Sequence, residues 1–552
     1  MKSGIQKFLL VLLAASLLLG GCSTSKDKAG LSLTPRPVQT LALTPIIEPT
    51  APQAPLPARL SFDASVPPAL RRAAQAPAGM KMAVNARDAT VTLGVQAEGG
   101  QTQWVYALVA PFPTLFDAVS LDELVAVWHG LTSAAYAQYP LRLSSETLEA
   151  FTQLWGAPAP SAVEVVDRLK LLELAWSQPG SLAILPFEEL EPRWKVLRVD
   201  DQSPIDKGFD ADAYPLTIRF GLSETEPGSA AKIVLPATNR DPEKMTVILM
   251  TGVTALVRAT AVKMEKMGMA YPGRDVLPWF EEADIRHISN EIAFSPDCPD
   301  PNAYQTALIF CSKPEYSELL EYVGANVIEL TGNHQMDWGH NAFTFSLNLY
   351  DELGMQYYAA GENAAKARAP LLIEDHGNKI AFIGCNPSGP ELVWATDEFP
   401  GVAQCDFEWM QSEIRWLRSQ GYLPIATMQY FEYYTPDPRP WQVEDFRGLA
   451  EAGAVIVSGS QAHKPQAFDF FGSNFIHYGV GNLFFDQMDI PVKGTRQEFL
   501  DRHIIYDGRY ISTELKTAML EDFARPRPMT EEERQQLLQD MFIASGWLEK
   551  VQ

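Results

Sequence analysis

The stretch ELTGNHQMDWGHNAF, residues 329–343, places an asparagine, a histidine and an aspartate directly behind the apolar run ANVIEL. Asn333 and His334 offer a carboxamide oxygen and an imidazole nitrogen, both of which can bind divalent metals, and Asp337 follows three residues later. An imidazole in this position could also transfer a proton in catalysis. The alternative is structural: His334 hydrogen-bonds Asp337 and takes no part in chemistry.

Further polar side chains follow other apolar runs of the chain. Glu291 follows ADIRHISN, Gln429 lies near the end of YLPIATMQY, and Gln461 and His463 follow GAVIVSG. Because active sites of α/β proteins lie at the carboxyl ends of their parallel strands, we expect these residues to line one cleft. Taken singly, Glu291 also fits a surface ion pair, and His463 also fits the plain end of a strand.

The elements that must position these residues alternate between strand-like and helix-like segments, which is typical of an α/β fold. Strands are expected within residues 245–259, 327–330, 379–384, 422–430, 453–459 and 474–481. Helices are expected within residues 314–324, 341–354, 407–421 and 441–453.

Five motifs in this region occur in the order found in the CapA family of capsule-synthesis, or poly-γ-glutamate-synthesis, proteins. They are TGVTALVR, ADIRHISNEIAF, ANVIELTGNHQMDWG, MQYFEYYTPDPRPWQ and VIVSGSQAHKPQAFDFFGSNFIHYGVGNLFFD. Residues 245–500 therefore resemble that family. The resemblance implies a calcineurin-like metallophosphoesterase fold, which is a four-layer α/β sandwich, and a metal site at its strand ends.

Several expected metal ligands are replaced in this chain. Val253 stands where the family has an aspartate, Gln429 and Gln461 stand where it has histidines, and Tyr433 stands where it has a glutamate. With so few anionic ligands left, we do not expect a two-metal centre. A single zinc or manganese ion bound by Glu291, His463 and Asn333 remains the alternative.

We consider three functions, of which the first two follow from this resemblance and the third from the first domain of the chain. The first is a CapA-type surface lipoprotein that makes or handles an envelope polymer, with a degenerate metal site that binds a polar ligand through Gln429, Tyr433, Gln461 and Asp337. The second is a single-metal, phosphoesterase-like hydrolase in which His334 and Asn333 are catalytic. The third is a solute- or glycan-binding lipoprotein.

Residues 58–225 are expected to form a smaller α/β domain. Its segment LDELVAVWHG and the later SLAILPFEELEPRWKVLRVDDQSP and YPLTIRF resemble a lobe of extracytoplasmic solute-binding proteins. Ser120 and Ser161 are expected to cap helices, each with a glutamate three residues later. Residues 226–244 are expected to be a linker, and residues 501–552 an extension that carries a surface helix.

The N-terminus has the pattern of a secretion signal. Lys2 and Lys7 precede an apolar run from Phe8 to Leu19, which is short for a membrane span, and LGGC resembles a lipobox that ends at Cys22. We expect residues 1–22 to be a lipoprotein signal with lipidation of Cys22, and the Pro-rich residues 23–57 to be a disordered tether. The chain would then be extracytoplasmic and bound to the bacterial membrane by lipid; the alternative is an uncleaved anchor helix.

The net charge bears on the binding partners of the protein, and the cysteines bear on its compartment. The 552-residue chain carries 68 acidic and 44 basic side chains, a formal net charge of -24, which argues against nucleic acid as a partner. Four cysteines besides Cys22 fit an oxidising compartment. We predict the local disulfides Cys298–Cys311 and Cys385–Cys405, with free buried cysteines as the alternative.

Overall fold

The computed structural model describes residues 58–96, 99–131, 140–178, 180–230 and 232–549, all of which lie in one compact unit. The expected signal sequence, the lipidation site Cys22 and the tether of residues 23–57 lie outside the described residues. Within the described residues, no helix combines the length and the apolar character needed to cross a membrane.

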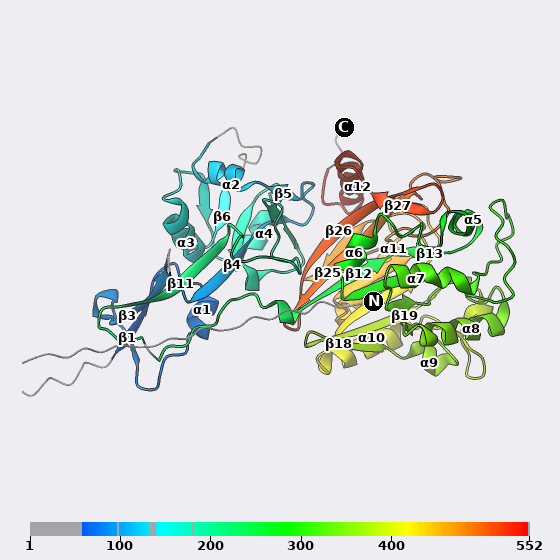
Figure 1. The fold of residues 1–552 in the computed structure, drawn as a ribbon, viewed down its shortest axis with the longest axis horizontal. Helices are drawn as coiled ribbons and strands as arrows, with labels where there is room; N and C mark the ends of the chain where they lie inside the picture. Colours follow the sequence, from blue (N-terminus) through cyan, green and yellow to red (C-terminus); the bar gives the residue numbers. More distant parts are fainter. Residues whose placement is uncertain (1–57, 97–98, 132–139, 179, 231, 550–552) are drawn as a thin grey trace, which may run out of the picture. The chain divides into compact units, whose positions relative to one another are not determined.

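The first part of the unit is built on a nine-stranded mixed sheet, drawn in blue to green in Figure 1. Its helices are α1 (Pro68–Ala73), α2 (Leu121–Trp128), α3 (Ser145–Trp155) and α4 (Leu171–Trp176). A short pair, β5 (Ala118–Val119) and β10 (Arg198–Val199), lies beside the sheet. In sheet order the strands are β2 (Lys81–Met82), β1 (Arg59–Phe62), β3 (Val91–Val95), β11 (Thr217–Glu224), β4 (Thr102–Pro111), β8 (Ala183–Pro186), β6 (Leu141–Leu143) and β7 (Val163–Val165), with β9 (Trp194–Val196) also paired to β4.

The two expected helix caps in this part have different outcomes. Ser120 caps α2 in a reciprocal capping box with Glu123, as predicted. The prediction for Ser161 is wrong: it has a positive φ of 67° and precedes strand β7, because the β-branched run AVEVV forms a strand instead of a helix. The expected linker also pairs with this sheet, since Asn239 exchanges two hydrogen bonds with the backbone of Val105.

The second part contains two further sheets. An eight-stranded sheet has the order β16 (Gln356–Tyr358), β15 (Val327–Glu329), β14 (Ile285–Asn290), β12 (Met245–Thr251), β25 (Gln497–Tyr506), β26 (Arg509–Glu521) and β27 (Arg525–Pro528), with β13 (Val253–Thr254) also paired to β14. A six-stranded sheet has the order β18 (Leu371–Asp375), β19 (Asn378–Cys385), β21 (Leu423–Gln429), β22 (Ile456–Ser460), β24 (Asn474–His477) and β23 (Phe468–Phe471). The pair β17 (Ala360–Gly361) and β20 (Gly401–Val402) completes the strands of this part.

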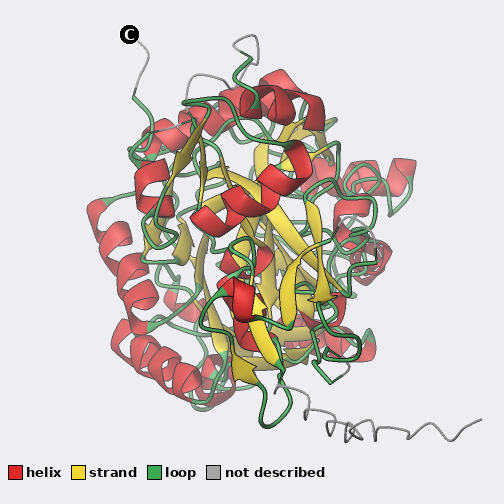
Figure 2. Ribbon diagram, turned by 90° about the vertical axis from the view of Figure 1, so that its left-hand side faces the viewer, coloured by secondary structure: helices red, strands yellow, loops and turns green. Residues whose placement is uncertain are grey.

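Side chains of these two sheets share one buried cluster, and Figure 2 shows helices around the strands of the molecule. Ile248 of β12 packs with Phe382 and Ile425 of the other sheet, whereas its neighbour Val247 faces a separate cluster that includes helix residues. Successive side chains of β12 thus point to opposite faces of its sheet, one towards the other sheet and one towards helices. This arrangement confirms the expected four-layer α/β sandwich. The helices of this part are α5 (Arg258–Met267), α6 (Leu277–Glu281), α7 (Glu318–Tyr322), α8 (Gly339–Glu352), α9 (Ala364–Arg368), α10 (Phe407–Ser419), α11 (Pro440–Ala452) and α12 (Glu531–Ala544).

The C-terminal boundary differs from the expectation. Strand β25 crosses residue 500 and pairs antiparallel with β12 in the middle of the sheet, so residues 501–521 belong to the sandwich and are not an appended extension. The helix expected on the surface is α12, which buries Leu537, Leu538, Met541 and Phe542.

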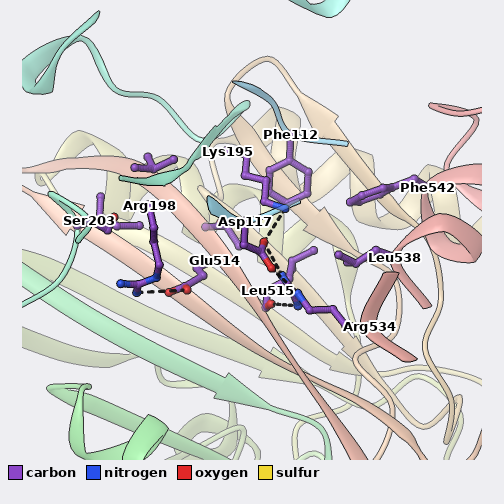
Figure 3. A pocket seen from close by; sticks show the side chains of 13 residues that line it. Phe112, Asp117, Lys195, Arg198, Ser203, Glu514, Leu515, Arg534, Leu538 and Phe542 are labelled. Atoms are coloured by element: carbon purple, nitrogen blue, oxygen red, sulfur yellow. Dashed lines mark hydrogen bonds and ion pairs between the residues drawn. The ribbon is translucent and has the colours of Figure 1, made fainter. Parts of the chain in front are cut away.

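Ion pairs join the first part to the second around a small cavity (Figure 3). Arg534 of α12 donates two hydrogen bonds to Asp117, at 2.6 and 2.9 Å, and Lys195 lies 2.7 Å from the same carboxylate. Burial opposes ionisation of Glu514, but nearby cations, foremost Lys516, outweigh it and lower its pKa to about 2. The cavity leaves about 30 Å³, roughly the space of one water, so this junction is packed rather than open.

Candidate functional site

The carboxamide of Gln429 is the centre of a buried polar cluster. Its Nε2 donates to Oε1 of Glu291 at 2.8 Å, to Oδ1 of Asn333 at 3.0 Å and to Oε1 of Gln461. Gln429 ends β21, Glu291 follows β14, Asn333 follows β15 and Gln461 follows β22. The carboxyl ends of strands from both sheets therefore meet at this cluster, and the four residues come together as predicted.

Three side chains of this cluster are almost fully buried, so losing their hydrogen bonds would cost folding free energy. Gln429, Glu291 and Gln461 are 2%, 3% and 4% exposed. An amide nitrogen carries two hydrogens, so three acceptor oxygens share them, and the positive end of the amide dipole points at the Glu291 carboxylate. The Gln429 side chain thus supplies part of the positive charge that a buried carboxylate needs.

His334 lies beside this cluster and is held by Asp337. Its Nδ1 is 2.7 Å from Oδ2 of Asp337, and the same oxygen accepts a hydrogen bond of 2.8 Å from the Phe310 N–H. Burial opposes protonation, but the hydrogen bond to Asp337 and the charge of Glu291 outweigh it and raise the pKa of His334. The imidazole is therefore biased towards its charged form.

The predicted disulfides are both present, and one of them supports His334. Cys298–Cys311 and Cys385–Cys405 have Cα separations of 5.7 and 4.9 Å. Phe310 precedes Cys311, and its ring meets the His334 ring edge-on at 4.8 Å. Closing the loop at Cys311 restricts the backbone that holds Asp337.

His463 is held in a tight turn after β22. Gln461 and His463 have positive φ angles of 80° and 53°, which cost free energy in non-glycine residues and recur at functional sites. The His463 Nδ1 is 2.9 Å from Oδ1 of Asn482, and the ring packs against Tyr434 and Phe485 at centroid distances of 6.1 and 5.3 Å. The partner Asn482, within the motif GVGNLFFD, was not predicted from the sequence.

Val253 lies in an apolar cluster where the family resemblance implies a metal-binding aspartate. It is 1% exposed and shares this cluster with Ile292, Phe310 and Phe485. Phe310 contacts His334 and Phe485 contacts His463, so this apolar cluster contacts both imidazoles.

Other expected site residues have different partners. The Tyr433 ring lies 6.2 Å from Trp441 and under the Arg439 guanidinium at 5.0 Å, and its described side-chain contacts do not reach the Gln429 cluster. The described partners of the Asp337 carboxylate are the His334 ring and the Phe310 N–H. Asp337 therefore contacts the Gln429 cluster only indirectly, through His334. Arg258 lies over the rings of Phe310 and Phe485 and forms a bidentate pair with both oxygens of Asp486. The sequence did not predict this pair, because neither charged residue stands out within TALVRA or LFFD.

Known proteins resemble the part of the chain that carries this site. Residues 247–487 match the family described as "Bacterial capsule synthesis protein PGA_cap". The chain is 25% identical over 261 residues to "Capsule biosynthesis protein CapA" of Bacillus anthracis, covering 46% of this chain and 63% of that protein. The chain thus spans less than two thirds of that relative's length.

Two solved structures show a weak similarity to parts of this chain. A 5'-nucleotidase precursor from Thermus thermophilus is 13% identical, with a TM-score of 0.32, over 54% of this chain and 59% of its own. An ABC-type phosphate transport receptor from Vibrio cholerae is 13% identical, with a TM-score of 0.23, over 26% of this chain and 69% of its own. At these TM-scores neither likeness bears on activity. The match over residues 247–487 and the relative from Bacillus anthracis agree, and this part of the chain is similar to the bacterial capsule synthesis (CapA, PGA_cap) family.

Proposed function

We propose that this protein acts in making or handling an envelope polymer of the capsule or poly-γ-glutamate type, through a site that works by hydrogen bonding rather than by a metal pair. The similarity of residues 247–487 to the capsule synthesis family supports the polymer class. The proposal includes an extracytoplasmic location with a lipid on Cys22 and residues 23–57 as the tether.

The proposal that this site works without metal rests on the hydrogen bonds from Gln429 Nε2 to Glu291, Asn333 and Gln461. A dication at this point would face the positive end of the amide dipole, and its oxygen ligands already accept the amide hydrogens. Two dications 3.5–4 Å apart, about the spacing in binuclear sites, also need several anionic ligands. Since Val253 is apolar and Glu291 is the single carboxylate in the cluster, these residues do not fit a metal pair.

Carboxamides suit a ligand that itself carries amide groups. The amide nitrogens of Asn333 and Gln461 can donate to the backbone carbonyls of a polypeptide-like polymer, and their oxygens, which accept from Gln429, each have a second lone pair for a polymer N–H. Asn333 is partly exposed, whereas Gln429 is buried, so a ligand would meet Asn333 first. The formal net charge of -24 opposes a polyanion, so we expect added salt to strengthen binding by screening that repulsion.

The test is binding of γ-linked polyglutamate to the full-length protein, measured by calorimetry in the presence of EDTA. We expect binding to persist with EDTA and to weaken at least tenfold in Asn333→Ala and Gln461→Ala. Gln535→Ala, a carboxamide removed from the exposed face of α12, is the matched control and should bind like the wild type. Binding that EDTA abolishes, or that both site variants retain, would refute the proposal, and α-linked polyglutamate tests selectivity.

A second candidate is a hydrolase in which protonated His334 donates a proton to a leaving group. The raised pKa of His334 and its contact with Asp337 favour it. Hydrolysis of a phosphodiester by the wild type, lost in His334→Ala but retained in His340→Ala, would establish this alternative; no hydrolysis would exclude it.

A further inference from the structure

We propose a divalent metal site formed by Asp284, Asp375 and His376, at the end of the sandwich opposite to the Gln429 cluster. In the described part of the chain, this is the one group of three or more His, Cys, Asp or Glu residues whose ligand atoms all lie within 4.8 Å of one another. The inference is independent of the proposed function, because it uses different residues and a different end of the strands.

The place of these residues in the fold separates them from the family site. Asp284 precedes β14, while Asp375 ends β18 and His376 occupies the turn into β19. The Gln429 cluster lies at the carboxyl ends of the parallel strands, whereas Asp284 lies at an amino end. A strand of seven residues such as β12 spans about 20 Å, so one ion cannot serve both places.

The His376 ring is oriented as a metal ligand. Its Nδ1 lies 3.2 Å from the backbone carbonyl oxygen of Glu243, which accepts the Nδ1 hydrogen and leaves Nε2 with a free lone pair. That Nε2 lies 3.7 Å from Asp284 Oδ1 and 3.9 Å from Asp375 Oδ2, beyond hydrogen-bonding distance of either. Histidines that bind metals commonly donate their other nitrogen to a carbonyl in this way.

Both carboxylates are also fixed by hydrogen bonds, Asp284 on the oxygen that faces away from His376 and Asp375 on the oxygen that faces it. The Val247 N–H donates to Oδ2 of Asp284 at 2.9 Å, and the Thr246 hydroxyl lies 2.7 Å from Oδ2 of Asp375. Ligand atoms bound tetrahedrally at about 2.0–2.1 Å stand roughly 3.3 Å apart, so each carboxylate oxygen would have to approach Nε2 of His376 by about 0.5 Å to share an ion with it. Two carboxylates and an imidazole suit Zn²⁺ or Mn²⁺, and the exposure of His376 leaves room for water as a further ligand.

The ammonium group of Lys207 would compete with this ion for the Asp284 carboxylate. Its ammonium pairs with Oδ1 of Asp284, the oxygen that faces His376. A bound ion would displace Lys207 from that oxygen and join the eight-stranded sheet, through Asp284, to the β18–β19 hairpin of the six-stranded sheet. Removing the ammonium should therefore raise the metal affinity, which no purely structural role for the histidine predicts.

The experiment is calorimetric titration of the purified, metal-stripped full-length protein with Zn²⁺ and with Mn²⁺. We expect one ion per chain, affinity lowered at least tenfold in Asp375→Asn and in His376→Asn, and affinity raised several-fold in Lys207→Met. Asparagine tolerates the positive φ of 47° at residue 376 but is too short to bind, so His376→Asn keeps the turn. The unfolding temperature of each apo variant reports whether it is folded.

Glu291→Gln with His463→Ala separates this site from the family site. Binding that this double variant retains and His376→Asn loses supports the inference. Absence of stoichiometric binding in the wild type overturns the inference and leaves the proposed function standing. Binding that Glu291→Gln with His463→Ala abolishes overturns the inference and the metal-free interpretation of the Gln429 cluster together.

Discussion

The carboxamide nitrogen of Gln429 lies 2.8 Å from Oε1 of Glu291, and both side chains are almost fully buried. A hydrogen bond to a buried charged group is worth about 1.5–3 kcal/mol, and its loss leaves the carboxylate short of a donor. We therefore expect Gln429→Ala to lower the free energy of unfolding by about 2 kcal/mol. Urea denaturation followed by fluorescence measures this change.

A double-mutant cycle isolates the contact from the general cost of a cavity. Glu291→Gln removes the charge but keeps the shape, and Gln429→Ala combined with Glu291→Gln should cost less than the sum of the two single changes. Additive costs would show that Gln429 stabilises the protein by packing alone.

Restoring the side chains implied by the family resemblance should create a metal site. Val253→Asp with Gln429→His and Gln461→His adds one carboxylate and two imidazoles beside Glu291. We expect this triple variant to hold at least one more Zn²⁺ or Mn²⁺ per chain than the wild type, measured by elemental analysis after dialysis.

The matched control is Val253→Asn with Gln429→Asn and Gln461→Asn, which is polar but offers neither carboxylate nor imidazole. Equal metal content in the triple variant and the wild type would show that the apolar cluster around Val253 excludes ions whatever the ligands.

Short-range patterns predicted much of the sandwich and of its site. Buried runs such as those ending at Asn290 and Gln429 are strands. Because sites of α/β proteins lie at carboxyl strand ends, the sequence alone places Glu291, Asn333, Gln429 and Gln461 in one cluster, as their contacts confirm. The disulfides were predictable because each closes a short loop.

Other features depend on partners distant in the chain. Strand β25 carries Asp501 and Arg502 in its middle, and these charges obscure its apolar alternation. His477 pairs with Asp501 at 2.6 Å and Glu514 pairs with Arg502 at 3.1 Å, contacts that no local pattern contains. Tyr433 was misplaced for the same reason, since its position depends on Arg439 and Trp441.

Asp337 should control the protonation of His334. A histidine whose pKa is raised on folding contributes stability that is fully present below its unfolded pKa, about 6.5, and is lost as pH rises through the folded pKa. Asp337→Asn should lower the pKa of His334 and flatten this loss of stability with rising pH. NMR titration of the His334 ring measures the shift, with Asp351→Asn on α8 as the control. An unchanged His334 pKa in Asp337→Asn would assign the shift to Glu291.

Glu188 should make stability depend on pH in the same direction as His334 but at lower pH. Burial raises the pKa of Glu188 to about 7, against hydrogen bonds from Asn239 at 2.6 Å and Trp104 at 3.2 Å that favour the charged form. A carboxyl whose folded pKa exceeds its unfolded value of about 4.5 binds its proton more tightly in the folded state. Its stability contribution is therefore present below about pH 4.5 and lost as pH rises to about 7.

We expect Glu188→Gln to remove about 3 kcal/mol of this decline in the free energy of unfolding between about pH 4.5 and 7.5. Relative to the wild type, Glu188→Gln should therefore gain stability at the upper end of this range. Urea unfolding at several pH values measures the difference, with the exposed Glu532→Gln on α12 as the control. Parallel pH profiles for Glu188→Gln and the wild type would contradict the prediction, because they would mean that Glu188 titrates alike in the folded and unfolded chains.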